Sequence, residues 1–337
     1  MTDDNGGPRW GVVGTGGIAH LFMEGLRATP SRITAIGSRT KERARTFADT
    51  WGIPTAHGSY EELAQDPKVD VVYIATPHPW HHPNALLFLQ AGKHVLVEKP
   101  MAMNALQVSE MIQTARANDL LLMEAMWTRC LPLHRKVREL VAEGAIGQVH
   151  SLHADFGINV PYDPDHRLFN VDLGGGALLD LGIYPLALAS RYLGDLTVVG
   201  ATRRLSPDGM VDTQTSILVQ GDNGATGTLT CASRSALANR AVIAGSRGRV
   251  EIDLFWMATD AVLYRDGHEP EKLHRPFRAN GYEYEAEEVA RCLAAGQTES
   301  PDMPWAESLH LAGVMDQIRD SARLIHSTPA VKTVPLN

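Results

Sequence analysis

A glycine turn close to the N-terminus is the feature that most constrains the fold. The apolar run 10–13 is followed by the pattern G-x-G-x-x-A at Gly14, Gly16 and Ala19, and then by a helix-like segment at 18–26. A strand, a glycine turn and a helix in this order are typical of a dinucleotide-binding βαβ unit. Gly14 allows the tight turn, Gly16 leaves room for a pyrophosphate, and Ala19 lets the helix pack on the strand. The pattern therefore predicts a nucleotide site.

The end of the second predicted strand, 32–37, bears on the choice of cofactor. In this fold an Asp or Glu at that point accepts a hydrogen bond from the adenosine ribose 2′-hydroxyl. The chain has Ser38 and Arg39 instead, with Arg43 close behind. A planar guanidinium binds a phosphate well and stacks on adenine. The sequence therefore predicts NADP(H) rather than NAD, the alternative being a solvated basic start to the next helix, 41–51.

Length and composition indicate a globular protein of two domains. The chain has 337 residues, and single hydrophobic cores stop growing at about 250–300 residues. Apolar residues make up 44% of the chain and charged residues 21%, which is ordinary for globular proteins. We expect an N-terminal Rossmann domain over 1–126 and a substrate-binding and oligomerisation domain over 127–337.

Charge and cysteine usage disfavour several classes of protein. The formal net charge of −8 argues against nucleic-acid and anionic-membrane partners. No uninterrupted apolar stretch is long enough to cross a bilayer, and the acidic first ten residues lack the apolar core of a signal peptide. Cys130, Cys231 and Cys292 have no C-x-x-C spacing, which favours buried thiols in a reduced, cytoplasmic protein.

The second half of the chain has the alternation of β-strands. Strand-like segments occur at 149–157, 198–205, 213–219, 225–232, 240–244, 249–254 and 261–264. Short turns separate the later ones, which predicts hairpins. We therefore expect a C-terminal α/β domain with an open, mostly antiparallel sheet, closed by helices at 282–295 and 305–325. The free face of an open sheet must be covered or paired, so a homodimer through this sheet is expected.

A histidine-rich loop follows the predicted strand 70–75 at the edge of the sheet where a cofactor would lie. It contains Thr76, Pro77, His78, His81 and His82. The spacing of the imidazoles is compatible with a metal. We expect no metal site, because no third ligand type has matching spacing and the histidines sit among prolines. His82 could instead contact substrate or ribose.

Three motifs in a fixed order carry a family resemblance. They are Gly14-x-Gly16-x-x-Ala19, Glu98-Lys99-Pro100, and the segment from Gly174-Gly175-Gly176 through Asp180 to Tyr184. Together they resemble the glucose–fructose oxidoreductase / inositol dehydrogenase / rhizopine catabolism (Gfo/Idh/MocA) family over nearly the whole chain. The segment 123–129 and the tyrosine at 184 are similar to the branch of dimeric dihydrodiol dehydrogenases and NADP-dependent D-xylose dehydrogenases. Most other branches carry a histidine at the position of Tyr184.

The resemblance implies a role for each residue of the motifs. Lys99 would bind the reacting oxygen, Tyr184 would be the proton donor or acceptor, and Asp180 would orient Lys99 or the substrate hydroxyl. Asp180 and Tyr184 are spaced one helical turn apart, and the nearby ammonium should favour the phenolate of Tyr184. Singly, each residue is as easily structural. The implied substrate-contacting residues are Lys99, Trp127, Phe156, Asp180 and Tyr184. The implied cofactor-binding residues are Gly14, Gly16, Gly17, Ile18, Ala19, Ser38, Arg39, Thr76, Pro77, His78, His81, Glu98, Lys99 and Trp127.

Two further expectations concern residues near these motifs. Glu98 is expected to be structural, pairing with a backbone group or holding its loop. Asn159, Asp165 and Arg167 lie in a loop before the glycine-rich helix and are in a position to reach substrate.

The combined pattern predicts an NADP(H)-dependent oxidoreductase acting on a C–OH or C=O group. A D-xylose-like aldose oxidised at C1 is the first candidate substrate and a cyclic trans-diol the second. Reduction of a keto-sugar would use the same residues. A non-catalytic dinucleotide-sensing regulator is an alternative that the intact Lys99, Asp180 and Tyr184 disfavour. An NAD-dependent, redox-assisted glycosidase is another, and Arg39 disfavours it.

Overall fold

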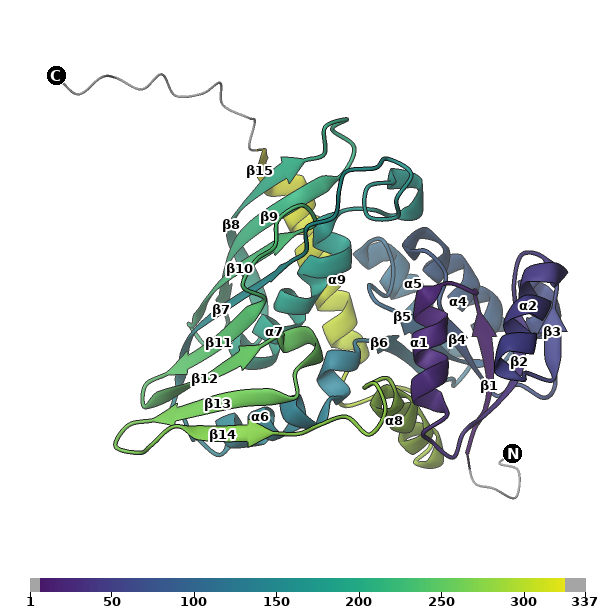
Figure 1. The fold of residues 1–337 in the computed structure, drawn as a ribbon, viewed down its shortest axis with the longest axis horizontal. Helices are drawn as coiled ribbons and strands as arrows, with labels where there is room; N and C mark the ends of the chain where they lie inside the picture. Colours follow the sequence, from purple (N-terminus) through teal and green to yellow (C-terminus); the bar gives the residue numbers. More distant parts are fainter. Residues whose placement is uncertain (1–6, 325–337) are drawn as a thin grey trace.

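The computed structural model describes residues 7–324 and contains two β-sheets with helices between and around them (Figure 1). The first sheet has six strands, all parallel, in the order β3-β2-β1-β4-β5-β6. This is the strand order of a dinucleotide-binding Rossmann fold, which confirms the predicted class of the first domain. The strands are β1 (Arg9–Val13), β2 (Arg32–Gly37), β3 (Thr55–His57), β4 (Val71–Ile74), β5 (His94–Glu98) and β6 (Leu122–Ala125).

Helices cover both faces of this sheet, so its central strands are apolar throughout. The helices are α1 (Gly17–Leu26), α2 (Lys41–Trp51), α3 (Tyr60–Ala64), α4 (His81–Gln90) and α5 (Ala105–Ala117). Local capping determines where they begin: the Thr40 side chain accepts from the N–H of Arg43, and Asn104 accepts from that of Gln107. The sequence missed β3 and α3, because three and five residues are too few to show a period.

The second sheet has nine strands in the order β14-β13-β12-β11-β7-β10-β9-β8-β15. Most neighbours are antiparallel, as expected, but β7 pairs with β10 and β8 with β15 in parallel, so the sheet is mixed. Two short strands, at 271–274 and 323–324, were not predicted from the sequence. The strands are β7 (Val149–Gly157), β8 (Leu196–Leu205), β9 (Asp212–Gly221), β10 (Thr226–Ala232), β11 (Arg240–Gly245), β12 (Gly248–Asp253), β13 (Asp260–Arg265), β14 (Glu271–His274) and β15 (Arg323–Leu324).

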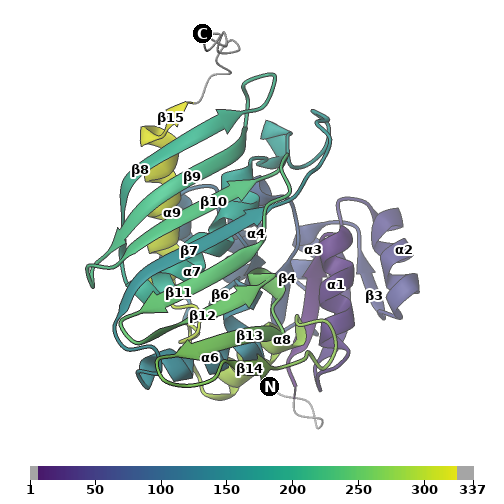
Figure 2. The same cartoon turned by 60° about the vertical axis from the view of Figure 1, so that its left-hand side comes forward.

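Four helices of the second half lie between the two sheets (Figure 1). They are α6 (Pro132–Ala142), α7 (Ile183–Leu193), α8 (Glu283–Ala294) and α9 (Trp305–Ser321). The helix α8 packs on α1, and α9 packs on both α5 and β8. Among residues 7–324, no helix covers the opposite face of the nine-stranded sheet (Figure 2). The predicted last helix is too long, because the chain leaves it at Ser321; its expected end, residue 325, lies outside the described residues. The domain boundary at 126 stays a prediction.

One helical segment, Val171–Leu193, is long and apolar enough to cross a bilayer by length and composition alone. It has 23 residues, but the helix is interrupted at 174–176 and the segment contains Asp172, Asp180 and Arg191, so its apolar pattern is not uninterrupted. Of its most apolar window, 89% is buried inside the protein. Its burial is that of a core helix in a soluble protein.

The glycine turn after β1 gives a stability prediction. Gly14 has a φ of +98°, and a Cβ built there would lie 2.8 Å from the carbonyl oxygen of Ala75. We expect Gly14→Ala to lower the free energy of unfolding by about 2 kcal/mol, because alanine is strained at this φ and meets backbone. Thermal unfolding measured by circular dichroism checks this.

Gly16→Ala is the matched control for that variant. Gly16 has a φ of −81°, and a Cβ there would meet nothing within 4 Å. This variant should lower the free energy of unfolding by less than about 1 kcal/mol, which is the cost of a less favourable helix cap. Equal melting temperatures for the two variants would contradict the assignment of the turn.

Candidate active site

The glycine turn leaves an open cradle at the start of α1. Gly16 is the N-cap of that helix and makes no side-chain cap, and both Gly16 and Gly17 are exposed. The first backbone N–H groups of a helix have no partner within it and carry the positive end of its dipole. Ala19 is fully buried against the strand. The residues present therefore fit a pyrophosphate.

The end of β2 lies beside this cradle. Ser38 is buried and its N–H binds the carbonyl oxygen of His57, whereas Arg39 and Arg43 are exposed. A hollow between the glycine turn and α2 is lined by Thr15 and Arg43 among others. The described residues of this strand end include no carboxylate that would repel a 2′-phosphate at 38–40.

The loop after β4 is held by histidines rather than by a metal. His81 is fully buried, with Nδ1 2.8 Å from the Pro100 carbonyl oxygen and Nε2 2.8 Å from the Thr76 carbonyl oxygen. This geometry makes His81 a brace of the loop, and its contact with a cofactor stays a prediction. His82 is also turned away, because its ring binds Glu110 at 2.7 Å. His78 reaches the segment 174–184 instead, with Nε2 3.8 Å from Oδ1 of Asp180.

Lys99, at the end of β5, joins the two halves of the chain. Its Nζ donates to the carbonyl oxygen of Asp180 at 2.8 Å and to Oδ1 of the same residue at 3.1 Å. The neighbouring Glu98 is buried and binds the Lys99 backbone N–H at 3.1 Å and the Tyr73 hydroxyl. Glu98 therefore holds the loop through a backbone group, which is the structural role expected for it.

Asp180 lies in a π-helical turn, Leu178–Gly182, immediately before α7. Such turns are rare and frequent at functional sites. Asp212, which the sequence did not single out, binds the Leu178 N–H at 2.8 Å and so fixes the start of this turn. Asp180 also lies 3.1 Å from Arg167 and 3.8 Å from the ring of His78. Of the three residues expected in the preceding loop, the structure brings Arg167 to the motifs.

Tyr184, the third residue of the set, faces the same ammonium. Lys99 Nζ lies 4.9 Å from the centre of the Tyr184 ring. Trp127 Nε1 donates to the Tyr184 hydroxyl oxygen at 3.2 Å, which leaves that hydroxyl free to donate its own proton. Phe156 meets the tyrosine ring edge-on at 5.5 Å. Trp127 is itself stacked on Tyr282, a neighbour the sequence gave no reason to expect.

The charges of the site fall into a definite pattern. Burial raises the pKa of Asp180, but Lys99 and Arg167 outweigh it and hold that pKa well below its usual range. Burial acts against the ammonium of Lys99, yet the facing Asp180 raises its pKa overall. Burial, followed by His81, lowers the pKa of His78 to about 3, so this ring is neutral. The site thus holds one carboxylate between two cations.

The expected phenolate at Tyr184 is corrected by the structure. Burial raises the pKa of Tyr184 above its ordinary value, and this effect exceeds the opposing attraction of Lys99. The side chain is only 8% exposed. Tyr184 therefore carries its proton at neutral pH.

The Lys99–Asp180 pair gives the second prediction. Asp180→Asn leaves a buried ammonium without its carboxylate, so the free energy of unfolding should fall by about 3 kcal/mol. Adding Lys99→Met should restore part of the loss, because the uncompensated charge is then gone. Urea unfolding of the two single variants and the double variant measures the coupling. Strictly additive losses would show that the pair does not stabilise the fold as inferred.

Comparison with known proteins agrees with this arrangement. Residues 8–126 match the family model described as an oxidoreductase family with an NAD-binding Rossmann fold, and residues 134–251 match the GFO/IDH/MocA C-terminal domain. Trans-1,2-dihydrobenzene-1,2-diol dehydrogenase of Mus musculus is 40% identical over 321 residues, covering 92% of this chain and 96% of the relative. The same enzyme of Oryctolagus cuniculus is 41% identical over 322 residues, covering 91% and 96%.

Solved structures agree as well. The 3-ketoreductase KijD10 of Actinomadura kijaniata, in complex with NADP and TDP-benzene, is 33% identical, with a TM-score of 0.84 over 95% of this chain and 99% of that one. The aldose-aldose oxidoreductase of Caulobacter crescentus is 26% identical, with a TM-score of 0.85 over 94% and 97%. The chain therefore belongs to the Gfo/Idh/MocA family of oxidoreductases, in the branch of the dihydrodiol dehydrogenases, and is a dehydrogenase or reductase that acts on CH–OH groups.

Proposed function

We propose that the protein is an NADP(H)-dependent oxidoreductase of a ring that carries adjacent hydroxyl groups, either a cyclic trans-diol or a sugar such as D-xylose. The observation that carries the proposal is the meeting of Lys99, Asp180 and Tyr184 at the end of β5, beside the aromatic side chains of Trp127 and Phe156. Charged and hydrogen-bonding side chains next to apolar aromatic ones suit such a ring. The names of the dihydrodiol dehydrogenase and aldose-aldose oxidoreductase relatives support the same substrate class.

The cofactor part of the proposal rests on the cradle at α1 and the end of β2. The N–H groups at Gly16, Gly17 and Ile18 would bind the pyrophosphate. The exposed guanidinium of Arg39, with Arg43 near the same hollow, would bind the 2′-phosphate of NADP. Support comes from the NADP present in the 3-ketoreductase structure. The loop residues Thr76, Pro77 and His78 would face the rest of the cofactor.

The mechanism assigns one task to each residue of the set. Nicotinamide, when bound, supplies or accepts the hydride. Lys99 donates a hydrogen bond to the reacting substrate oxygen and stabilises negative charge developing on it. Tyr184 holds the proton that is exchanged with this oxygen, and Trp127 keeps its hydroxyl in place. Asp180 is a positioning residue that holds the Lys99 ammonium.

The raised pKa of Tyr184 favours reduction as a second candidate direction. A tyrosine that carries its proton is ready to give it to a carbonyl oxygen as the hydride arrives. A keto-sugar or other cyclic ketone is then the substrate. In the direction of oxidation, Tyr184 must first lose its proton, so that activity should rise toward alkaline pH.

We also propose a homodimer in the cytoplasm. Val199 on β8 and Leu218 on β9 are exposed apolar side chains of the nine-stranded sheet, one face of which no described helix covers. Pairing of this face with a second copy would cover them. The three free cysteines are all buried, which suits a reducing compartment. A monomer in analytical sedimentation at micromolar concentration would overturn the dimer.

The first test of the function is spectrophotometric. Purified protein is incubated with NADP and a panel of aldoses and cyclic trans-diols, or with NADPH and keto-sugars, with NAD and NADH in parallel. A change of absorbance at the reduced nicotinamide band, larger with NADP(H), supports the proposal. Cofactor binding without turnover on the whole panel would contradict it and point to a dinucleotide-sensing regulator.

The role of Lys99 gives a third prediction. Lys99→Ala should lower kcat about 10³-fold, because it removes a charge that acts mainly in the transition state, while the Kd for NADP stays nearly unchanged. Steady-state kinetics and fluorescence titration measure the two quantities. Lys68→Ala, the same change at an exposed lysine ahead of β4, should retain full activity. Near-normal turnover in Lys99→Ala would remove this residue from the catalytic set.

The cofactor preference gives a fourth prediction. Arg39→Ala should raise the Kd for NADP about 10- to 100-fold and leave that for NAD nearly unchanged, because a charge-assisted hydrogen bond to the 2′-phosphate contributes about 1.5–3 kcal/mol. Arg45→Ala, which removes an exposed arginine on α2, is the control. Equal losses for NADP and NAD would place Arg39 elsewhere on the cofactor.

A further inference from the structure

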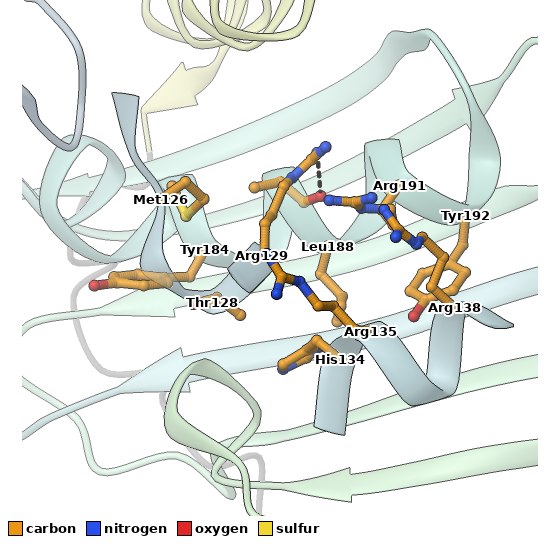
Figure 3. A pocket seen from close by; sticks show the side chains of 11 residues that line it. Met126, Thr128, Arg129, His134, Arg135, Arg138, Tyr184, Leu188, Arg191 and Tyr192 are labelled. Atoms are coloured by element: carbon orange, nitrogen blue, oxygen red, sulfur yellow. Dashed lines mark hydrogen bonds between the residues drawn. The ribbon is translucent and has the colours of Figure 1, made fainter. Parts of the chain in front are cut away.

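Behind the catalytic tyrosine, a small cavity lies along α7 among basic side chains. Its volume is about 20 Å³, which is room for one or two water-sized species. Tyr184 forms one end of it, and Tyr192 on the same helix lines it further on. The remaining polar lining comes from Thr128, from His134 and from four arginines, Arg129, Arg135, Arg138 and Arg191 (Figure 3).

Carboxylates balance only part of this positive charge. Asp302 binds Arg135 and Arg138, each at 2.7 Å, and Glu307 binds Arg129. Glu288 also approaches Arg135 at 3.3 Å, but it makes a closer pair with Arg291 at 2.7 Å. Four guanidinium groups, those of Arg129, Arg135, Arg138 and Arg291, therefore share three carboxylates.

Two of the arginines have donors left over. Within residues 7–324, Arg191 makes no ion pair with a carboxylate, and its side chain binds only the carbonyl oxygen of Asp302 at 2.8 Å. Arg129 is 8% exposed, and its Nε is buried without a partner in the described structure. Burial and the neighbouring Arg129 and Arg138 lower the pKa of Arg191 to about 10, which still leaves it charged at neutral pH. Positive charge with free donors thus surrounds the cavity.

We propose that this cavity is a binding site for a small inorganic anion of the size of chloride. The volume admits a single small ion and is too small for a phosphate or a carboxylic acid. An anion there would satisfy free guanidinium donors and offset the repulsion among Arg129, Arg138 and Arg191. The inference stands on these contacts and is independent of the proposed substrate and cofactor.

The position of the site connects it with Tyr184. Arg191 lies two turns further along the same helix, and Arg129 is two residues after Trp127, which donates to the Tyr184 hydroxyl. Arg135 and Arg138, which also line the cavity, lie on α6. A bound anion would therefore hold α6, α7 and the segment after β6 against one another. It acts on the catalytic tyrosine through position and does not touch substrate.

Thermal unfolding in two sodium salts tests the proposal. Melting temperature is measured in sodium chloride and in sodium gluconate at equal ionic strength. The wild-type Tm should rise with the logarithm of the chloride concentration once that exceeds the Kd, by about 2–3 °C at 10- to 30-fold excess, relative to gluconate. In Arg191→Met this chloride-specific rise should vanish. Arg249→Met, at an exposed arginine paired with Glu251 on β12, should keep it and so controls for general salt effects.

Crystals grown or soaked in sodium bromide test occupancy directly. An anomalous peak in the cavity between Arg129 and Arg191 is expected in the wild type and should be absent in Arg191→Met. The proposal is overturned if the wild-type Tm is the same in both salts, or if no bromide peak appears there. It is also overturned if Arg191→Met loses the same stability in both salts, because the arginines are then satisfied by the protein alone.

Discussion

The contact between the Lys99 ammonium and Asp180 is the interaction on which the site depends. The two residues are 81 positions apart in the chain, one at the end of a Rossmann strand and the other at the start of the helix under the second sheet. Both are largely withdrawn from water, so neither charge is tolerable without the other. Arg167 adds a second cation to the same carboxylate. Lys99 and Arg167 thus present two cations where an oxygen with developing negative charge would be stabilised.

Burial determines the chemistry of the tyrosine more than its charged neighbours do. A cation at 4.9 Å from the ring would by itself favour the phenolate. Enclosure by Trp127 and Phe156 removes the water that a phenolate needs, and the proton stays on. The aromatic side chains that would face the proposed ring substrate are therefore the same ones that keep the proton on Tyr184.

The parts of the fold that the sequence predicted are those set by local signals. The bounds of β2 and α2 agree with the structure residue for residue, because a helix cap at Thr40 follows directly on an apolar run. The proposed catalytic residues came from a family pattern, since no local signal brings Lys99 to Asp180. The phenolate prediction failed because the sequence shows neighbours along the chain and not enclosure. The arginines of the cavity come from three separate segments, so no spacing in the sequence reveals them.

The return of the last helices to the first sheet makes the dinucleotide-binding half an unsuitable unit for recombination. A Cβ on Gly25 of α1 would lie 2.7 Å from the backbone nitrogen of Glu283, at the start of α8, so the two helices meet almost backbone to backbone. Transplanting α1 and β1 onto another substrate domain would separate α1 from α8. The surfaces of these two helices are complementary, although more than 250 residues lie between them in the chain. Exchange of cofactor specificity within this branch is therefore more accessible through point changes at the end of β2 than through the shuffling of whole segments.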